Sequence, residues 1–103
     1  MKNVSLENKV GELLLKCGIT PEIKGFHYII DAVCAWDGEK NCMEIYYEVA
    51  YKHRVRWTKV ERTIRHAFGK LDYSKKNVKA FFGEIEPKNY KLISVIAWRC
   101  REE

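Results

Sequence analysis

The chain has 103 residues, of which 47% are hydrophobic, so it is long enough to bury one core and too short for two domains. Its formal net charge of +5 favours polyanionic partners, although proteins that never bind nucleic acid carry similar charges. The sequence contains no apolar run long enough to cross a membrane and no secretion signal. We therefore expect a cytoplasmic protein with a single domain, residues 1–103, and no membrane partner.

The four cysteines are scattered along the chain without a Cys-x-x-Cys pair: Cys17, Cys34, Cys42 and Cys100. Most of them fall in apolar helical stretches, which favours buried, reduced thiols. A zinc site would need close pairs of ligands, and the spacing of the cysteines and histidines does not supply them. We predict no metal and no cofactor, and nothing in the spacing signals a disulfide.

The spacing of apolar residues predicts two helices before residue 40. The first covers residues 6–17, with Ser5 as its N-cap and Gly18 as its C-terminal stop. The second is strongly apolar, begins at Gly25 and ends near Asp37-Gly38. Its composition predicts that it is well buried.

The segment after residue 40 predicts a helix-turn-helix. A third helix over about 41–53 is followed by the short, basic turn 54–57 and then by a fourth helix over about 58–71. Thr58 and Glu61, three residues apart, match a capping box. This pattern would start the fourth helix at Thr58 and direct its N-terminus outward.

The last third of the chain predicts a basic loop and two further helices. Residues 73–79 are polar and basic and lead into a short helix that Gly83 ends. A last helix follows Pro87 and finishes in the charged tail 99–103. Nothing alternates with the period of a strand. The predicted fold is all-α, with about six helices that include the helix-turn-helix.

Most aromatic residues recur on apolar stripes and are predicted to lie in the core: Phe26, Tyr28, Trp36, Tyr46, Phe68, Phe81, Phe82 and Trp98. Trp57 differs, because it falls in the predicted turn among arginines. It could pack under the turn as a wedge or lie exposed at an interface. We favour the wedge.

The fourth predicted helix is amphipathic. Its apolar residues recur at helical spacing: Val60, Ile64, Ala67, Phe68 and Leu71. Its remaining residues are rich in cations and hydrogen-bond donors: Lys59, Arg62, Arg65, His66 and Lys70. Such a helix suits the major groove of DNA, where base edges and phosphates accept hydrogen bonds.

Four motifs give the chain a family resemblance over nearly its whole length: Ile23-Lys24-Gly25-Phe26, Val60-Glu61-Arg62-Thr63-Ile64-Arg65-His66-Ala67, Phe82-Gly83 and Pro87-Lys88-Asn89. With them the chain resembles the C-terminal effector domain of the sporulation initiation master regulator, stage zero sporulation protein A. The second motif is the most specific. The chain is similar to that domain standing alone, without the receiver domain of the full regulator.

The resemblance implies a fold and a partner. The family's effector domain is a six-helix module of the response-regulator type that binds double-stranded DNA at a box close to TGTCGAA. It often binds as head-to-tail dimers on tandem boxes, so a homodimer on DNA is implied. We accordingly expect a bacterial protein that associates with the nucleoid when bound, and we expect no control by phosphorylation of a receiver.

The resemblance and the basic pattern together select candidate DNA contacts. The residues expected at base edges are Glu61, Arg62, Arg65 and His66. Those expected at phosphates are Lys24, Arg54, Arg56, Thr58, Lys59 and Lys75. Three of these roles have plain alternatives. Arg65 could pair with Glu61 within the helix, Glu61 could close the capping box, and Lys75 could lie in an ordinary solvated turn.

The sequence supports a sequence-specific DNA-binding transcription regulator as the leading hypothesis. The alternative is an interaction module that dimerises with, or antagonises, a full-length regulator. RNA binding is less favoured, because the aromatic residues are assigned to the core and not to a stacking platform. No arrangement of nucleophile, base or phosphate loop is present, so we predict neither an enzyme nor a small-molecule substrate.

Overall fold

The computed structural model describes residues 5–102 as an all-α fold without strands. Its six helices are α1 (Leu6–Lys16), α2 (Gly25–Ala35), α3 (Cys42–His53), α4 (Trp57–Phe68), α5 (Lys76–Phe82) and α6 (Asn89–Glu102). The predicted fold class and the order of the helices are therefore confirmed. None of the described helices combines the length and the apolar character needed to span a membrane.

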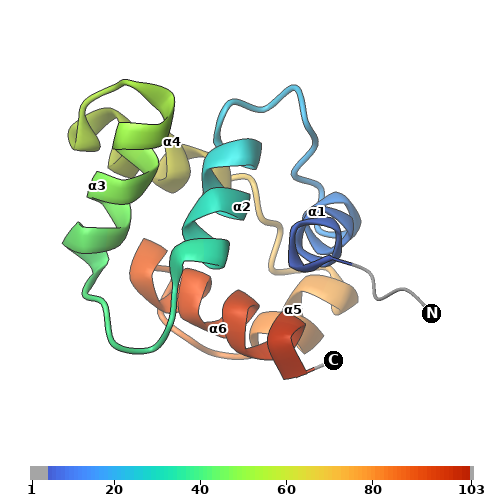
Figure 1. Ribbon diagram of the computed structural model, residues 1–103. Helices are drawn as coiled ribbons and strands as arrows, with labels where there is room; N and C mark the ends of the chain where they lie inside the picture. Colours follow the sequence, from blue (N-terminus) through green and yellow to red (C-terminus); the bar gives the residue numbers. More distant parts are fainter. Residues whose placement is uncertain (1–4, 103) are drawn as a thin grey trace.

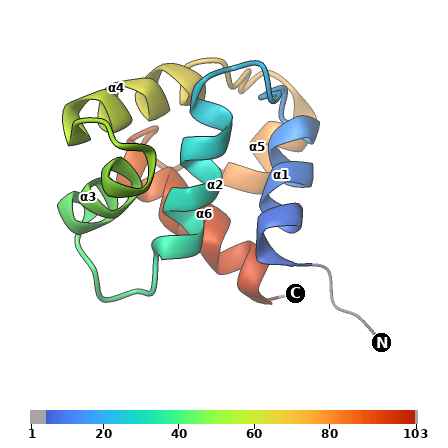
Figure 2. The same cartoon turned by 45° about the horizontal axis from the view of Figure 1, so that its top comes forward.

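The second helix lies in the middle of the molecule (Figures 1 and 2). On one side it meets α3 and α4, and on the other side it meets α1, while α6 also packs against it. In Figure 2, α4 lies across the N-terminal end of α2. The apolar stripe predicted for α4 is buried as expected, and so the helix presents its opposite face to solvent.

The predicted N-cap of α1 is confirmed, because the Ser5 side chain accepts a hydrogen bond from the backbone N–H of Asn8 at 3.1 Å. A capping box does form in the protein, but at α3. The Asn41 side chain accepts from the backbone N–H of Glu44, and the Glu44 carboxylate accepts from the backbone N–H of Asn41, both at 2.9 Å. This box fixes the start of the first helix of the helix-turn-helix.

The capping box predicted for Thr58 and Glu61 is wrong. The fourth helix begins one residue earlier, at Trp57, its N-cap is Arg56, and no side chain caps it. Trp57 is thus the first residue of the helix and not part of the turn. It stacks on Tyr46 of α3, with ring centroids 6.4 Å apart and an interplanar angle of 13°. This tertiary contact fixes the helix start in preference to the local capping pattern.

Several other predicted boundaries also shift. The fourth helix ends at Phe68 and not near residue 71, and Leu71 is buried just beyond it. The second helix ends at Ala35, two residues before the predicted Asp37-Gly38. The last helix includes the start of the charged tail and continues to Glu102. Residue 103 lies outside the described residues.

The core contains most of the predicted aromatic residues, with one exception. Phe26, Tyr46, Phe68 and Phe82 are buried, and the remaining predicted rings except one are half-buried against them. Trp98 is 59% exposed, so its assignment to the core is wrong. The buried residues of α6 follow a helical stripe to which Trp98 does not belong: Leu92, Ile93, Ile96, Ala97 and Cys100.

The closest approach of α2 and α4 is made possible by a glycine. A Cβ atom added to Gly25 would lie 2.5 Å from the Cβ of Ala67 and 2.8 Å from the carbonyl oxygen of Thr63. Real Cβ atoms essentially never come so close to another atom. The glycine therefore lets the first turn of α2 pack directly on the backbone of α4.

Candidate nucleic-acid interface

The exposed face of α4 carries most of the residues expected to contact DNA. Arg62, Arg65 and His66 are exposed, as are Thr58 and Lys59 near the helix start. This helix follows α3 after only the residues 54–56. The predicted helix-turn-helix is therefore present, and its second helix displays the polar side chains that the sequence predicts.

Two shallow hollows follow this face and share Arg62. The first lies at the start of the helix and is lined by Lys24, Val55, Arg56, Thr58, Lys59, Arg62 and Thr63. The second lies towards its end and is lined by Arg62, Arg65, His66, Gly69 and Lys70. We call the polar residues of the two hollows the basic strip: Lys24, Arg56, Thr58, Lys59, Arg62, Thr63, Arg65, His66 and Lys70.

The cations of the basic strip are almost all unpaired. Within residues 5–102, no hydrogen bond or ion pair involves the side chains of Lys24, Arg56, Lys59, Arg62 or Lys70. Neither hollow is lined by a carboxylate. Unpaired cations gathered in one place repel one another, and an anion that lies across them removes this repulsion.

Arg65 is the member of the strip that has a partner. Its Nε donates to Glu61 Oε2 at 3.0 Å and its Nη2 donates to Glu61 Oε1 at 3.3 Å. This bidentate bond raises the pKa of the guanidinium and holds its plane in one orientation. Arg65 and Glu61 thus pair within the helix, which was one of the alternatives that the sequence allowed. This pairing occupies the Glu61 carboxylate, which the predicted capping box would have used.

Two of the expected phosphate contacts lie apart from the strip. Arg54 caps the C-terminus of α3 in a left-handed conformation, with φ 57°, and lines a separate hollow beside Tyr51 that shares Val55 with the first hollow of α4. Lys75 is the N-cap of α5 and lines neither hollow of the basic strip. Seven of the ten predicted residues therefore lie together along the hollows of α4. The other three are Arg54, Lys75 and the partly buried Glu61.

The predicted DNA contacts do not include four residues that shape this surface. Thr63 and Lys70 line its hollows, and their helical spacing from His66, three residues before it and four after it, indicates the same face. Gly25 sets the approach of α2, and Asn89 bonds to the backbone of α4 from α6. Both of these belong to quoted motifs, but no local pattern indicates their partners.

An aromatic cluster holds the two helices of the helix-turn-helix together. The half-buried ring of Trp57 stacks on Tyr46 and meets Tyr47 edge-on, with ring centroids 6.3 Å apart in the second pair. Trp57 therefore acts as a wedge between α3 and α4. This is the favoured of its two sequence interpretations, although the residue is in the helix and not in the turn.

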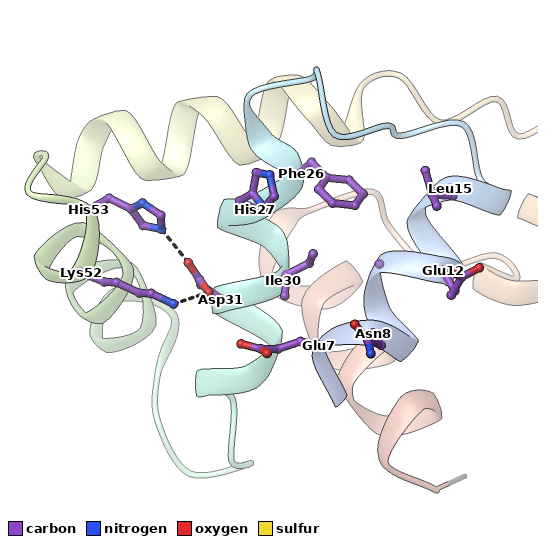
Figure 3. A pocket seen from close by; sticks show the side chains of 11 residues that line it. Glu7, Asn8, Glu12, Leu15, Phe26, His27, Ile30, Asp31, Lys52 and His53 are labelled. Carbon is purple, nitrogen blue, oxygen red and sulfur yellow. Dashed lines mark hydrogen bonds and ion pairs between the residues drawn. The ribbon is translucent and has the colours of Figure 1, made fainter. Parts of the chain in front are cut away.

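A second charged surface lies between α1 and α3, and α2 forms its floor (Figure 3). We call it the α1–α3 groove, and its polar members are Glu7, Asn8, Glu12, His27, Asp31, Lys52 and His53. Here the basic side chains of α3 lie against a carboxylate of α2. Asp31 accepts a hydrogen bond from Lys52 Nζ at 2.9 Å and lies 2.6 Å from His53 Nε2.

These features define a class of protein. An all-helical fold whose helix-turn-helix presents an unpaired cationic face belongs to the DNA-binding helix-turn-helix proteins. Within that class, the chain belongs to the family of the C-terminal domain of the sporulation initiation factor Spo0A, whose profile matches residues 10–100. This family consists of DNA-binding effector domains of a transcription regulator, not of catalytic domains. No solved structure gives a significant match to the chain.

Proposed function

We propose that this protein is a sequence-specific DNA-binding transcription regulator that inserts α4 into the major groove. The observation that carries the proposal is the basic strip, whose cations other than Arg65 have no internal partners in residues 5–102. Phosphate oxygens would supply those partners, and the release of counterions from DNA would favour binding. The family resemblance supplies the expected target, a box close to TGTCGAA, with a homodimer on tandem boxes.

The geometry of α4 supports the assigned contacts. Arg62 and Arg65 lie three residues apart on the exposed face, so both can reach base edges in one groove and bind guanine O6 and N7. Glu61 and His66 are assigned to neighbouring base positions. The proposed phosphate contacts are Lys24, Arg56, Thr58 and Lys59 at the start of α4, together with Arg54 and Lys75, which lie apart from the strip. Phosphate contacts position the helix but carry no sequence information.

Fluorescence anisotropy tests this function directly. A labelled duplex with two TGTCGAA boxes is compared with a scrambled duplex across a salt series, because non-specific binding weakens steeply with salt. We expect a preference for the boxes that persists as salt rises. Equal affinity for the two duplexes at every salt concentration would contradict sequence-specific binding.

Arginine variants then test the assigned base readers. Arg62→Ala and Arg65→Ala should each lower the preference by about 1–3 kcal/mol while the helical circular dichroism stays unchanged. Arg99→Ala is the matched control, because Arg99 lies on α6 and covers the ring of Phe81 at 5.0 Å. It should leave the preference intact. A preference retained in both α4 variants would reject the assignment of these residues.

One observation favours a second candidate, a protein-interaction module that binds or antagonises a full-length regulator of the family. Trp98 and Tyr90 of α6 are large aromatic side chains left exposed, and such residues are common at protein interfaces. This candidate predicts that the chain co-elutes with such a regulator in the absence of DNA. Trp98→Ser should abolish the co-elution, and a pure DNA binder would not co-elute at all.

A further inference from the structure

Asn89 is the one buried polar residue among residues 5–101, and its side chain joins three helices. Its relative exposure is 8%, and it is the first residue of α6. Its Nδ2 donates to the hydroxyl of Tyr46 in α3 and to the backbone carbonyl oxygen of Glu61 in α4, both at 3.0 Å. One amide group thus ties the last helix to both helices of the helix-turn-helix.

The chemistry of this bridge requires an amide. A carbonyl oxygen can only accept, so the group that faces Glu61 must be a donor, and the two N–H bonds of an amide serve both acceptors at once. The Tyr46 hydroxyl is itself fixed. Burial and a hydrogen bond with Cys42 raise its pKa, and its ring stacks on Trp57. The Tyr46 hydroxyl, which accepts the hydrogen bond from Asn89, is therefore held in place by contacts other than Asn89.

The bridge meets α4 next to the residues proposed to read DNA. Trp57 and Glu61 are one helical turn apart, so the aromatic stack and the Asn89 amide hold the same side of α4 at two successive points. The carboxylate of Glu61 in turn orients Arg65. A residue that α6 holds by its backbone therefore directs the guanidinium on the exposed face.

We propose that Asn89 is a positioning residue for DNA recognition, which sets the rotation of α4 and thereby the places of Arg62 and Arg65. The inference rests on the proposed function and names a residue outside the helix-turn-helix. Recognition groups must be held to within about 0.5 Å of their productive positions. Loss of the bridge would leave α4 folded on its apolar stripe but free to rotate slightly, so cognate DNA would lose more affinity than scrambled DNA.

The first test uses Asn89→Leu, which has a similar size and removes both hydrogen bonds. Two measurements are made: amide hydrogen exchange of residues 57–65 by NMR without DNA, and the affinity ratio of boxed to scrambled duplex. We expect exchange in α4 to accelerate at least several-fold relative to α1. We also expect the preference to fall by about tenfold, the order of one lost base contact, with an unchanged salt dependence.

Two further variants keep the inference falsifiable. Tyr46→Phe retains the ring and removes one acceptor, so it should give a smaller change in the same direction even if Asn89→Leu folds poorly. Ile96→Val removes one methylene from a fully buried side chain of α6 without touching the bridge. It serves as a control for general loss of stability, and it should leave the preference for the boxes unchanged.

The outcomes separate this inference from the proposed function. If Ile96→Val lowers the preference as much as Asn89→Leu at a matched loss of stability, or if neither bridge variant changes it, Asn89 has only a structural role. If the wild-type chain itself shows no preference for the boxes, the proposed function fails. The exchange measurement then decides independently whether Asn89 holds α4, and unchanged exchange would overturn the inference.

Discussion

The basic strip and the α1–α3 groove are both charged, but they use their charges differently. In the groove, Asp31 neutralises Lys52 and lies against His53, at 2.9 Å and 2.6 Å. Its side chain is only 14% exposed, so the cluster serves to join α2 to α3. In the strip, Arg65 has a partner in Glu61, but within the described part of the chain the other arginines and lysines have none: Lys24, Arg56, Lys59, Arg62 and Lys70.

The difference shows how a structural charge can be told from a functional one. A paired charge in a half-buried position contributes to the folded state, whereas a group of exposed like charges stabilises nothing within the chain. The strip therefore needs an external anion to make its charges favourable, whereas Lys52 in the groove already has one in Asp31. The predictions below separate the two surfaces by stability and by the salt dependence of DNA binding.

The largest effect is expected at the glycines that underlie the two surfaces. Gly25→Ala places a Cβ 2.5 Å from the Cβ of Ala67, and relief of that clash requires α4 to move. We expect a loss of about 1–3 kcal/mol in the free energy of unfolding, measured in urea, together with weaker DNA binding. Gly11→Ala is the control on the α1 side of the groove, where the new Cβ would meet Phe26 and Ile30 at ordinary distances of 3.7 and 3.8 Å.

Gly11 lies in the middle of α1, so its replacement by alanine should stabilise the protein by up to about 1 kcal/mol through helix propensity. If Gly25→Ala lowered neither the free energy of unfolding nor the affinity for DNA, the close packing of α2 on α4 would not position the strip. The double variant Gly25→Ala/Ala67→Gly removes the atom of closest contact. It should recover part of the stability that Gly25→Ala loses.

The next largest effect on stability is expected at Asp31, the carboxylate of the groove that lies against Lys52 and His53. Asp31→Ala removes the partner of both Lys52 and His53 and should lower the free energy of unfolding by about 1–2 kcal/mol, because charge-assisted hydrogen bonds are lost. Its effect on the salt dependence of DNA binding should be negligible. Urea unfolding and anisotropy titrations check the two statements. A changed salt slope with unchanged stability would reverse the roles given to the two surfaces.

A smaller effect distinguishes two lysines. Lys24→Gln should leave stability within about 0.5 kcal/mol of wild type and should reduce the slope of log K against log salt by about 0.9, the value for one phosphate contact. Lys52→Gln should leave that slope unchanged, because its ammonium is bonded to Asp31. Equal slopes for the two variants would show that Lys24 does not contact phosphate.

The smallest effect is a dependence on alkaline pH. The hydrogen bond to Asp31 raises the pKa of Lys52 above its ordinary value of 10.5. The stabilisation that it provides is therefore fully present below that value and is lost as pH rises through the higher pKa of the folded state. The stability difference between wild type and Lys52→Gln should stay constant at neutral pH and shrink in strongly alkaline urea titrations. A difference that grows with pH would contradict this assignment.

The sequence alone predicts the fold class, the order of the helices and the exposed face of α4, because periodicity and the family motifs are strong over these segments. It predicted a capping box at Thr58 and Glu61, where none forms, and did not single out Asn41 and Glu44, where one does. Asn41 with Glu44 and Thr58 with Glu61 have the same spacing, yet only the first box forms. The stacking of Trp57 on Tyr46 decides the second case, and that contact is invisible in local sequence.

The same limit explains the residues around the candidate site that the sequence pattern missed. Gly25 meets Ala67, and Asn89 meets Glu61, across long stretches of chain. Helical periodicity reports which face is apolar but not which neighbour it meets. Trp98 shows the same limit in another way. It was assigned to the core because it is an aromatic residue in an apolar run, but it lies off the buried stripe of α6 and is exposed.

The left-handed Arg54 has a consequence for attempts to engineer this fold. A residue with a side chain is strained in that conformation by about 1 kcal/mol, and glycine is the usual choice at such a helix end. The chain instead keeps an arginine where α3 and α4 join. It thereby retains a positive charge at this point and loses some thermal stability. Consensus-style stabilisation that introduced glycine here would be expected to raise the melting temperature and at the same time delete a cation near the start of α4.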